Sequence, residues 1–184
     1  MTDSGASSYH RFLQGDSAGL EELVRMYGDA LVRFAYCFLG DPFAAEDVME
    51  DTFATLVVKR KKFDARANFK AYLFRIARNK CIDMLRTRKR YAAFDEHAEQ
   101  MLLGSDLEAD AALSERNKQL YCAMQQLPED YRKVLDLIYF ENFNVTETAK
   151  ILKKSRKQVY NLLARAKLQL KKFLILAGID DENF

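Results

Sequence analysis

The 184-residue sequence has no tryptophan, two prolines, seven glycines and only two histidines. So few helix-breaking residues, in a chain rich in Leu, Ala, Glu, Lys and Arg, favour helix throughout. The three cysteines, Cys37, Cys81 and Cys122, are widely spaced within apolar helical patterns, and we expect them to be buried structural thiols. The sequence has no Cys/His cluster with zinc spacing, no Walker loop, no glycine-rich dinucleotide turn and no nucleophile elbow. These absences argue against an enzyme, a bound metal and a cofactor.

Long apolar runs are also missing. The N-terminal stretch MTDSGASSYHRFLQGD has no apolar core of signal-peptide length, and no segment approaches the roughly 18 apolar residues of a transmembrane helix. We therefore expect a soluble cytoplasmic protein without membrane insertion. Residues 1–9 are expected to be disordered, and residues 178–184 are expected to form a C-terminal tail.

The net charge of +2 conceals a strong segregation of charge along the chain. Residues 59–90 contain thirteen Lys and Arg against two Asp, and residues 150–172 contain nine Lys and Arg and no acid. Between these blocks, residues 95–115 carry seven acids and no Lys or Arg. Two basic blocks separated by an acidic one indicate two anion-binding modules and a connector, although a run of charge is also typical of a solvated face.

Hydrophobic periodicity predicts helices and no convincing strand. Asp41 followed by Pro42 is a typical helix start, an N-cap with proline at the first helical position. The predicted fold class is all-α, with two small helical domains, residues 10–91 and 112–177, joined by a flexible acidic linker over 92–111. The predicted helices span residues 17–27, 29–40, 42–61 and 68–90 in the first domain, and 112–127, 129–141, 145–152 and 155–177 in the second.

Residues 144–177 have the sequence form of a helix-turn-helix. Asn144 and Glu147 form a capping-box pair before a short helix, Lys153 and Lys154 make a tight turn, and Ser155 caps the last helix. One side of that helix is apolar and predicted to pack inward. The opposite side presents hydrogen-bond donors and little bulk, which suits phosphates and base edges in a major groove; it carries Lys157, Asn161, Ala164, Arg165 and Lys172.

Residues 68–90 predict a second helix of mixed character. Its apolar side faces away from Arg75, Arg78, Asn79 and Arg86, and the aromatic residues Phe63, Phe69 and Tyr72 lie around its start. Cationic side chains beside aromatic rings suit single-stranded nucleic acid, because unpaired bases stack on rings while the backbone follows positive charge. An ordinary amphipathic helix with solvated arginines, and aromatic residues that serve the core, is the alternative interpretation.

At these residues the chain resembles a known family. The segments AEDVMEDTFATL and NFKAYLFRIARNKCIDMLRTRKR resemble region 2 of an extracytoplasmic-function (group 4) sigma factor of the sigma-70 superfamily. The segment LPEDYRKVLDLIYFENFNVTETAKILKKSRKQVYNLLARAKLQLKKFL is similar to region 4. The resemblance implies a bacterial transcription initiation factor that binds core RNA polymerase, directs it to −35 and −10 promoter elements and assists melting. It also implies that an anti-sigma factor regulates the protein.

The resemblance further implies a role for particular positions. Asp47, Glu50 and Asp51 would contact the β′ clamp helices of core polymerase, and the second domain would also dock on the β flap. The positions implied for −35 DNA are Ser155, Arg156, Lys157, Tyr160, Asn161 and Arg165. The positions expected at −10 DNA, including the basic face of the helix, are Asp64, Ala65, Arg66, Ala67, Asn68, Tyr72, Arg75, Arg78 and Arg86.

Several positions depart from the family pattern. Tyr72 and Val57 stand where tryptophans are usual, Lys153 stands where the turn often has glycine, and Gln158 and Leu162 replace the usual Thr and Arg. Two other functions therefore remain under consideration. An ordinary helix-turn-helix regulator would leave the first basic helix and the acidic patch without a role, and a sigma-like adaptor would bind polymerase without reading DNA.

Overall fold

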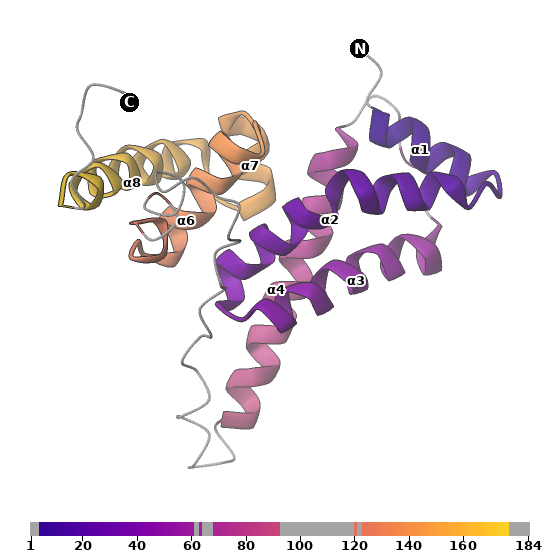
Figure 1. The fold of residues 1–184 in the computed structure, drawn as a ribbon, viewed down its shortest axis with the longest axis horizontal. Helices are drawn as coiled ribbons and strands as arrows, with labels where there is room; N and C mark the ends of the chain where they lie inside the picture. The colour runs from indigo at the N-terminus through magenta and orange to yellow at the C-terminus, as the bar shows by residue number, and fades with distance from the viewer. Residues whose placement is uncertain (1–3, 61–62, 64–67, 93–119, 121–122, 177–184) are drawn as a thin grey trace. The chain divides into compact units, whose positions relative to one another are not determined.

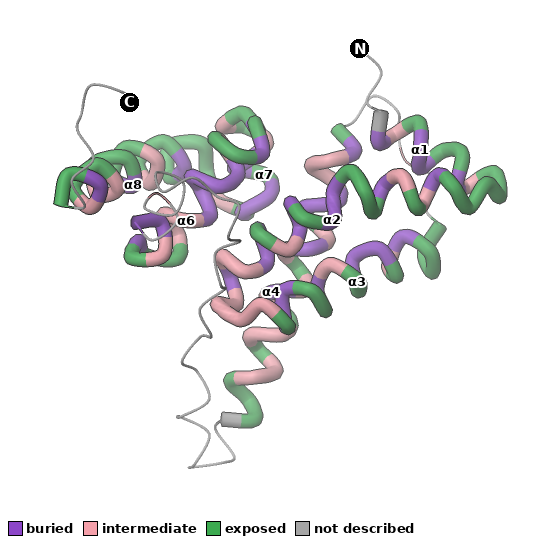
Figure 2. The backbone as a smooth tube through the Cα atoms, in the orientation of Figure 1, coloured by how far each residue is buried: buried purple, intermediate pink, exposed green. Residues whose placement is uncertain are grey.

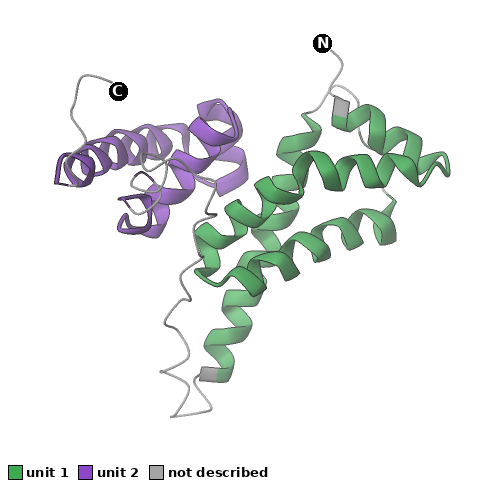
Figure 3. Ribbon diagram, viewed as in Figure 1, with its two compact units in different colours: residues 1–105 green, residues 106–184 purple. Residues whose placement is uncertain are grey.

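The computed structural model describes residues 4–60, 63, 68–92, 120 and 123–176. These residues form helices and connecting turns without any strand, which confirms the predicted all-α class. The chain divides into two compact units, residues 1–105 and 106–184, coloured separately in Figure 3. The division falls in the acidic segment between the basic blocks, residues 95–115, which lies outside the described residues.

The described residues of unit 1 form four helices (Figure 1): α1 (Ser4–Leu13), α2 (Ala18–Leu39), α3 (Pro42–Lys59) and α4 (Phe69–Ala92). Helices α2, α3 and α4 pack against one another around a core of apolar residues that recur at helical spacing. Figure 2 shows the resulting alternation of buried and exposed residues along α2 and α3. The fully buried side chains include Leu23, Leu31, Phe34, Val48, Leu56, Leu73 and Phe74.

Helix α1 corrects the prediction that residues 1–9 are disordered, because residues 4–9 belong to this helix. Tyr9 and Phe12 are 1% and 6% exposed and bury its apolar side against the unit. The approach to α2 is very close at Gly19, where a Cβ atom would lie 2.3 Å from the carbonyl oxygen of Ser8. Residues 4–9 include three serines, so this part of α1 has no clear apolar pattern in the sequence. The surface that covers Tyr9 comes from other helices.

Helix α2 is a single helix, whereas the sequence predicts separate helices over 17–27 and 29–40. Gly28 lies inside it with helical geometry, so this glycine does not break the chain. A glycine inside a helix costs about 1 kcal/mol relative to alanine, and the packing of α2 against three other helices offsets that cost. The helix ends at Gly40, which adopts a left-handed φ of 63°.

Unit 2 contains α6 (Glu129–Leu135), the π-helical turn η2 (Asp136–Phe140), α7 (Val145–Leu152) and α8 (Arg156–Leu176). Its core joins Met124, Leu127, Leu135 and Ala166, with partly buried Leu163 and Phe173 packed against them. The predicted helix over 129–141 changes to π geometry after Leu135, since the amide of Glu141 donates to the carbonyl of Asp136 at 3.0 Å. Most of the predicted helix over 112–127 lies outside the described residues, although residues 123–125 are helical.

Candidate nucleic-acid and protein interfaces

The helix-turn-helix of unit 2 is closed by reciprocal hydrogen bonds at the start of each helix. At α7, the Asn144 side chain accepts from the Glu147 amide at 2.9 Å, and the Glu147 carboxylate accepts from the Asn144 amide at 3.0 Å. At α8, Ser155 Oγ accepts from the Gln158 amide at 3.2 Å, and Gln158 Oε1 accepts from the Ser155 amide at 2.7 Å. Both N-caps predicted from the sequence are therefore present, and Gln158 completes the second one.

The turn between these helices is held in two further ways. Lys153 takes the left-handed conformation, with φ of 54°, and ends α7 where a glycine would be less strained. Lys154 Nζ lies 2.9 Å from a carboxylate oxygen of Asp130 on α6, and this ion pair fastens the turn to the rest of the unit. This ion pair could not be predicted from the sequence, because its two residues are 24 positions apart.

The candidate −35 residues share the exposed side of α8. Val159, Ala166 and Leu174 are buried against the unit, which confirms the predicted inward side of the helix. Tyr160 is 60% exposed, although tyrosine is a large side chain that is often packed in a protein core. The structure thus brings together all six positions on the solvent side of the helix start and its first turns: Ser155, Arg156, Lys157, Tyr160, Asn161 and Arg165.

The start of α4 carries the part of the candidate −10 set that the structure describes. Asn68 caps the helix, since its Oδ1 accepts from the Ala71 amide at 3.0 Å. Its side chain therefore already has a structural role, which substitution by alanine would remove at a cost of about 1 kcal/mol. The preceding candidates, Asp64, Ala65, Arg66 and Ala67, lie outside the described residues.

An aromatic cluster surrounds this helix start. The ring centroid of Phe63 is 5.3 Å from that of Phe69 and 5.4 Å from that of Tyr72. Phe69 is fully buried, which makes it a core residue, whereas Phe63 and Tyr72 are only partly buried. The guanidinium of Arg75 lies 6.0 Å from the centroid of the Tyr72 ring. A partly exposed ring beside a cation is suited to stack an unpaired base.

The other arginines of α4 differ in their environment. Arg75 and Arg86 are exposed, and Arg78 is partly buried. Burial lowers the pKa of Arg78, and the nearby charge of Arg86 lowers it further, while Cys81 acts in the opposite direction. A guanidinium keeps its proton at neutral pH even when it is partly buried, so Arg78 stays cationic.

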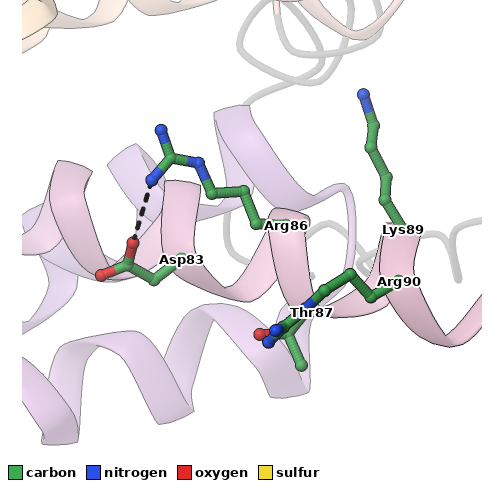
Figure 4. A pocket seen from close by; sticks show the side chains of 5 residues that line it. All are labelled: Asp83, Arg86, Thr87, Lys89 and Arg90. Atoms are coloured by element: carbon green, nitrogen blue, oxygen red, sulfur yellow. Dashed lines mark ion pairs between the residues drawn. The ribbon is translucent and has the colours of Figure 1, made fainter.

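The last turns of α4 form an open pocket, shown in Figure 4, lined by Asp83, Arg86, Thr87, Lys89 and Arg90. Arg86 reaches back toward Asp83, with 3.8 Å between their charged atoms, and both side chains are more than two-thirds exposed. Lys89 extends away from this pair. Cationic groups in such an open arrangement suit a phosphate backbone and have no geometry specific to one small ligand.

Arg88, in the same turns, points to a different partner. Its guanidinium lies 2.8 Å from Asp41, the residue that caps α3 by accepting from the Ala44 amide. Burial would raise the pKa of Asp41, but the bonds from Ala44 and Arg88 outweigh burial and lower it. Arg88 therefore anchors α3 to α4.

The acidic patch of α3, defined as Asp47, Glu50 and Asp51, is exposed as the sequence predicts. Its residues lie opposite the buried side of the helix, which carries Val48 and Thr52. Asp51 also forms a 3.2 Å ion pair with Lys80 of α4, a contact between distant residues that sequence reasoning missed.

Two classes of site are not found in the part of the chain that the structure describes. No group of three or more His, Cys, Asp or Glu side chains there is arranged to hold a metal ion. Within the same residues, each helix is too short or too polar to span a bilayer.

Comparison with known proteins gives matches for both units. The family model for Sigma-70 region 2 matches residues 23–91, and the model for Sigma-70, region 4, matches residues 117–170. The ECF RNA polymerase sigma factor SigW of Bacillus subtilis is 30% identical over 149 residues, covering 76% of this chain and 80% of the relative. SigM of the same organism, also an ECF RNA polymerase sigma factor, is 29% identical over 163 residues, covering 89% of this chain and 99% of the relative.

Two solved structures share the fold. CnrH, in complex with the cytosolic domain of CnrY, superposes with a TM-score of 0.65 at 25% identity, covering 95% of this chain and 99% of that chain. The sigma factor RpoE of Bartonella quintana, in complex with the anti-sigma factor NepR, superposes with a TM-score of 0.72 at 24% identity. That superposition covers 84% of this chain and 95% of RpoE.

Proposed function

The chain belongs to the extracytoplasmic-function family of RNA polymerase sigma factors, which direct transcription initiation, and from this premise we propose how its surfaces divide the work. The α8 surface reads the −35 element as duplex DNA. The start of α4 holds the −10 element as it melts. The acidic patch of α3 binds the β′ clamp helices of core polymerase, while unit 2 docks on the β flap.

The observation that carries this proposal is the chemical difference between the two cationic surfaces. On α8, exposed donors project from a helix whose start is fixed by two capping bonds, and such a helix suits the edges of paired bases. On α4, the partly buried rings of Phe63 and Tyr72 lie beside Arg75, and such rings suit bases that have left the stack. A duplex-binding regulator needs the first surface only.

A further partner is proposed from the two structural relatives. Each was solved with a second protein bound, an anti-sigma factor for RpoE and the cytosolic domain of CnrY for CnrH. We extend this to the present chain as regulation by an anti-sigma factor in the cytoplasm, where the polymerase also is. Such a partner would keep the sigma factor from core polymerase until a signal releases it.

Run-off transcription with core polymerase on a promoter library tests the proposal as a whole. Initiation that depends on the added chain, with a common pair of elements near −35 and −10, is the expected result. Tight and specific duplex binding by the free chain, without initiation, would instead support an ordinary helix-turn-helix regulator. Polymerase binding without any preference among promoters would support the adaptor.

Variants of single residues test the division of labour. Lys157→Ala and Arg165→Ala should weaken protection of the −35 element, each base contact being worth about 1–3 kcal/mol. Tyr72→Ala should leave that protection intact and reduce permanganate reactivity at −10, because a stacked base contributes about 1–3 kcal/mol. Lys167→Ala on α8 and Tyr91→Ala on α4 are matched controls, since both side chains are exposed on the same helices and neither belongs to the proposed DNA-binding positions. Identical footprints and reactivity for the two sets would show that the division is wrong.

A further inference from the structure

Helix α1 lies outside both family matches, the first of which begins at residue 23. It nevertheless contacts the aromatic cluster at the start of α4. The centroid of the Tyr9 ring is 5.1 Å from that of Phe69. In Figure 1 the first turn of α4 accordingly lies beside α1. Burial raises the pKa of Tyr9, and nearby Tyr72 raises it further.

The same helix also contacts the residue that follows α3. The guanidinium of Arg60 lies over the ring of Phe12, 5.3 Å from its centroid. Arg60 directly follows α3 and Phe69 begins α4, so these two residues mark the two ends of the connection between the helices. Phe12 therefore contacts the beginning of this connection and Tyr9 contacts its end, and the two rings are themselves 6.2 Å apart.

Helix α1 is in turn joined to the start of α2 by ion pairs, a hydrogen bond and a close backbone approach. Arg11 binds the carboxylates of Asp16 at 2.7 Å and Glu22 at 2.9 Å, and the Ser8 hydroxyl donates to Glu22 at 2.7 Å. At Gly19 the backbones of α1 and α2 are too close to admit a Cβ atom. The two aromatic side chains of α1 thus project from a helix that is held along its length.

We infer that α1 is a positioning element for the −10 contact: Tyr9 and Phe12 hold the two ends of the α3–α4 connection and so set where Phe63 and Tyr72 present their rings. The inference rests on the proposed role of Tyr72 in melting. Neither Tyr9 nor Phe12 is exposed enough to touch DNA, so each acts through the rings and the cation that it contacts. Base capture requires a preorganised surface. If the rings of Phe63 and Tyr72 were mobile, the entropy cost of immobilising them would weaken their binding to the base.

The experiment compares Tyr9→Leu, which removes the ring, with Tyr9→Phe, which keeps it, using the full chain bound to core polymerase. Phe38→Leu is the matched control. Phe38 is also a buried aromatic residue of unit 1, 7% exposed, but it lies near the C-terminal end of α2, whereas α1 packs on the N-terminal end. Melting temperature, affinity for core polymerase, −35 protection and the rate of promoter opening are measured for each. A promoter with a mismatched, already open −10 element is tested in parallel.

We expect Tyr9→Leu to open duplex promoter about tenfold more slowly than Phe38→Leu, which corresponds to ~1.4 kcal/mol in the barrier. For Tyr9→Leu, core affinity and −35 protection should match those of the control. Tyr9→Phe should behave as the wild type. Tyr9→Leu should also bind the promoter with the already open −10 element more weakly than the control does. Equal opening rates for Tyr9→Leu and Phe38→Leu would overturn the inference. If Tyr9→Leu does not fold, Phe12→Leu decides in the same way, because it releases the other end of the connection.

Tyr72→Ala separates this inference from the proposed function. If Tyr72→Ala opens promoters at the wild-type rate, the assignment of the −10 surface fails and the inference about α1 fails with it. If Tyr72→Ala is slow while Tyr9→Leu and Phe12→Leu match the control, the −10 surface stands and only the role of α1 is refuted.

Discussion

Reversing the charge of the acidic patch should separate core binding from folding. The change is Asp47→Lys with Glu50→Lys; Asp51 is left in place because it pairs with Lys80. Both side chains are exposed on α3, and among the described residues neither forms an ion pair. A lysine at 47 would lie one turn before Asp51, and such i,i+4 pairs are worth about 0.2–0.5 kcal/mol. We therefore expect the free energy of unfolding to change by less than about 0.5 kcal/mol per substitution.

The effect on polymerase binding should be much larger. Two like charges about 4 Å apart near a protein surface repel by ~4 kcal/mol at an effective dielectric constant of about 20. Even one such juxtaposition raises Kd roughly a thousandfold, because each 1.4 kcal/mol is about a factor of ten. Fluorescence anisotropy of the labelled chain, titrated with core polymerase, measures this change, and circular dichroism follows melting.

A control with the same change in net charge removes the general electrostatic effect. Glu21→Lys with Asp29→Lys places two reversals on exposed positions of α2 in the same unit. This control should bind core polymerase within a few-fold of the wild type. A patch variant that bound as well as the control would refute the placement of the core-binding surface, and one that had lost its helical signal would show that the patch is structural.

The remaining predictions concern stability and salt. Lys153→Gly should stabilise unit 2 by about 1 kcal/mol by relieving the left-handed residue, and an unchanged Tm would contradict that strain. The hydrogen bonds from Arg11 lower the pKa of Asp16, and those from Ser8 and Arg11 lower that of Glu22. Their stabilisation should be complete above the ordinary pKa values of 3.8 and 4.5 and be lost as pH falls through the lower folded values. Arg11→Met should flatten the acid side of the pH–stability curve, and an unchanged curve would exclude this network. DNA binding by the free chain should weaken steadily as salt rises, and gel-shift titrations that show no dependence would count against phosphate contacts.

The features that the sequence predicted well are decided within a few residues. Asp41 accepts from the Ala44 amide, and Asn144 exchanges hydrogen bonds with Glu147, so each cap is contained in four consecutive residues. The buried side of α8 follows from periodicity alone, because one face of the helix is apolar from Val159 to Leu174. The positions of the candidate −35 residues on the exposed side of this helix follow for the same reason.

The features that the sequence did not predict depend on contacts between distant residues. Helix α1 is stable because Tyr9 finds Phe69, sixty positions later, and no local pattern records that partner. The π turn after Leu135 arises from a carbonyl of Asp136 that accepts from residue 141, and periodicity does not distinguish it from an α-helical end. For the same reason, the Lys80–Asp51 pair between α4 and α3 became visible only in the structure.

The close approach at Gly19 has a consequence for how this protein tolerates mutation. Any other residue there places a Cβ atom 2.3 Å from a backbone oxygen and 2.9 Å from a backbone nitrogen of α1. No side-chain rotation relieves such an overlap, because Cβ itself and the main chain are the clashing groups. Substitutions at most exposed positions of unit 1 would change its stability by small and graded amounts. Every substitution at residue 19 would instead displace α1 from its contact with α2. Random mutagenesis should therefore return residue 19 as a hot spot for heat-sensitive alleles, in which a core of α2, α3 and α4 persists while α1 detaches.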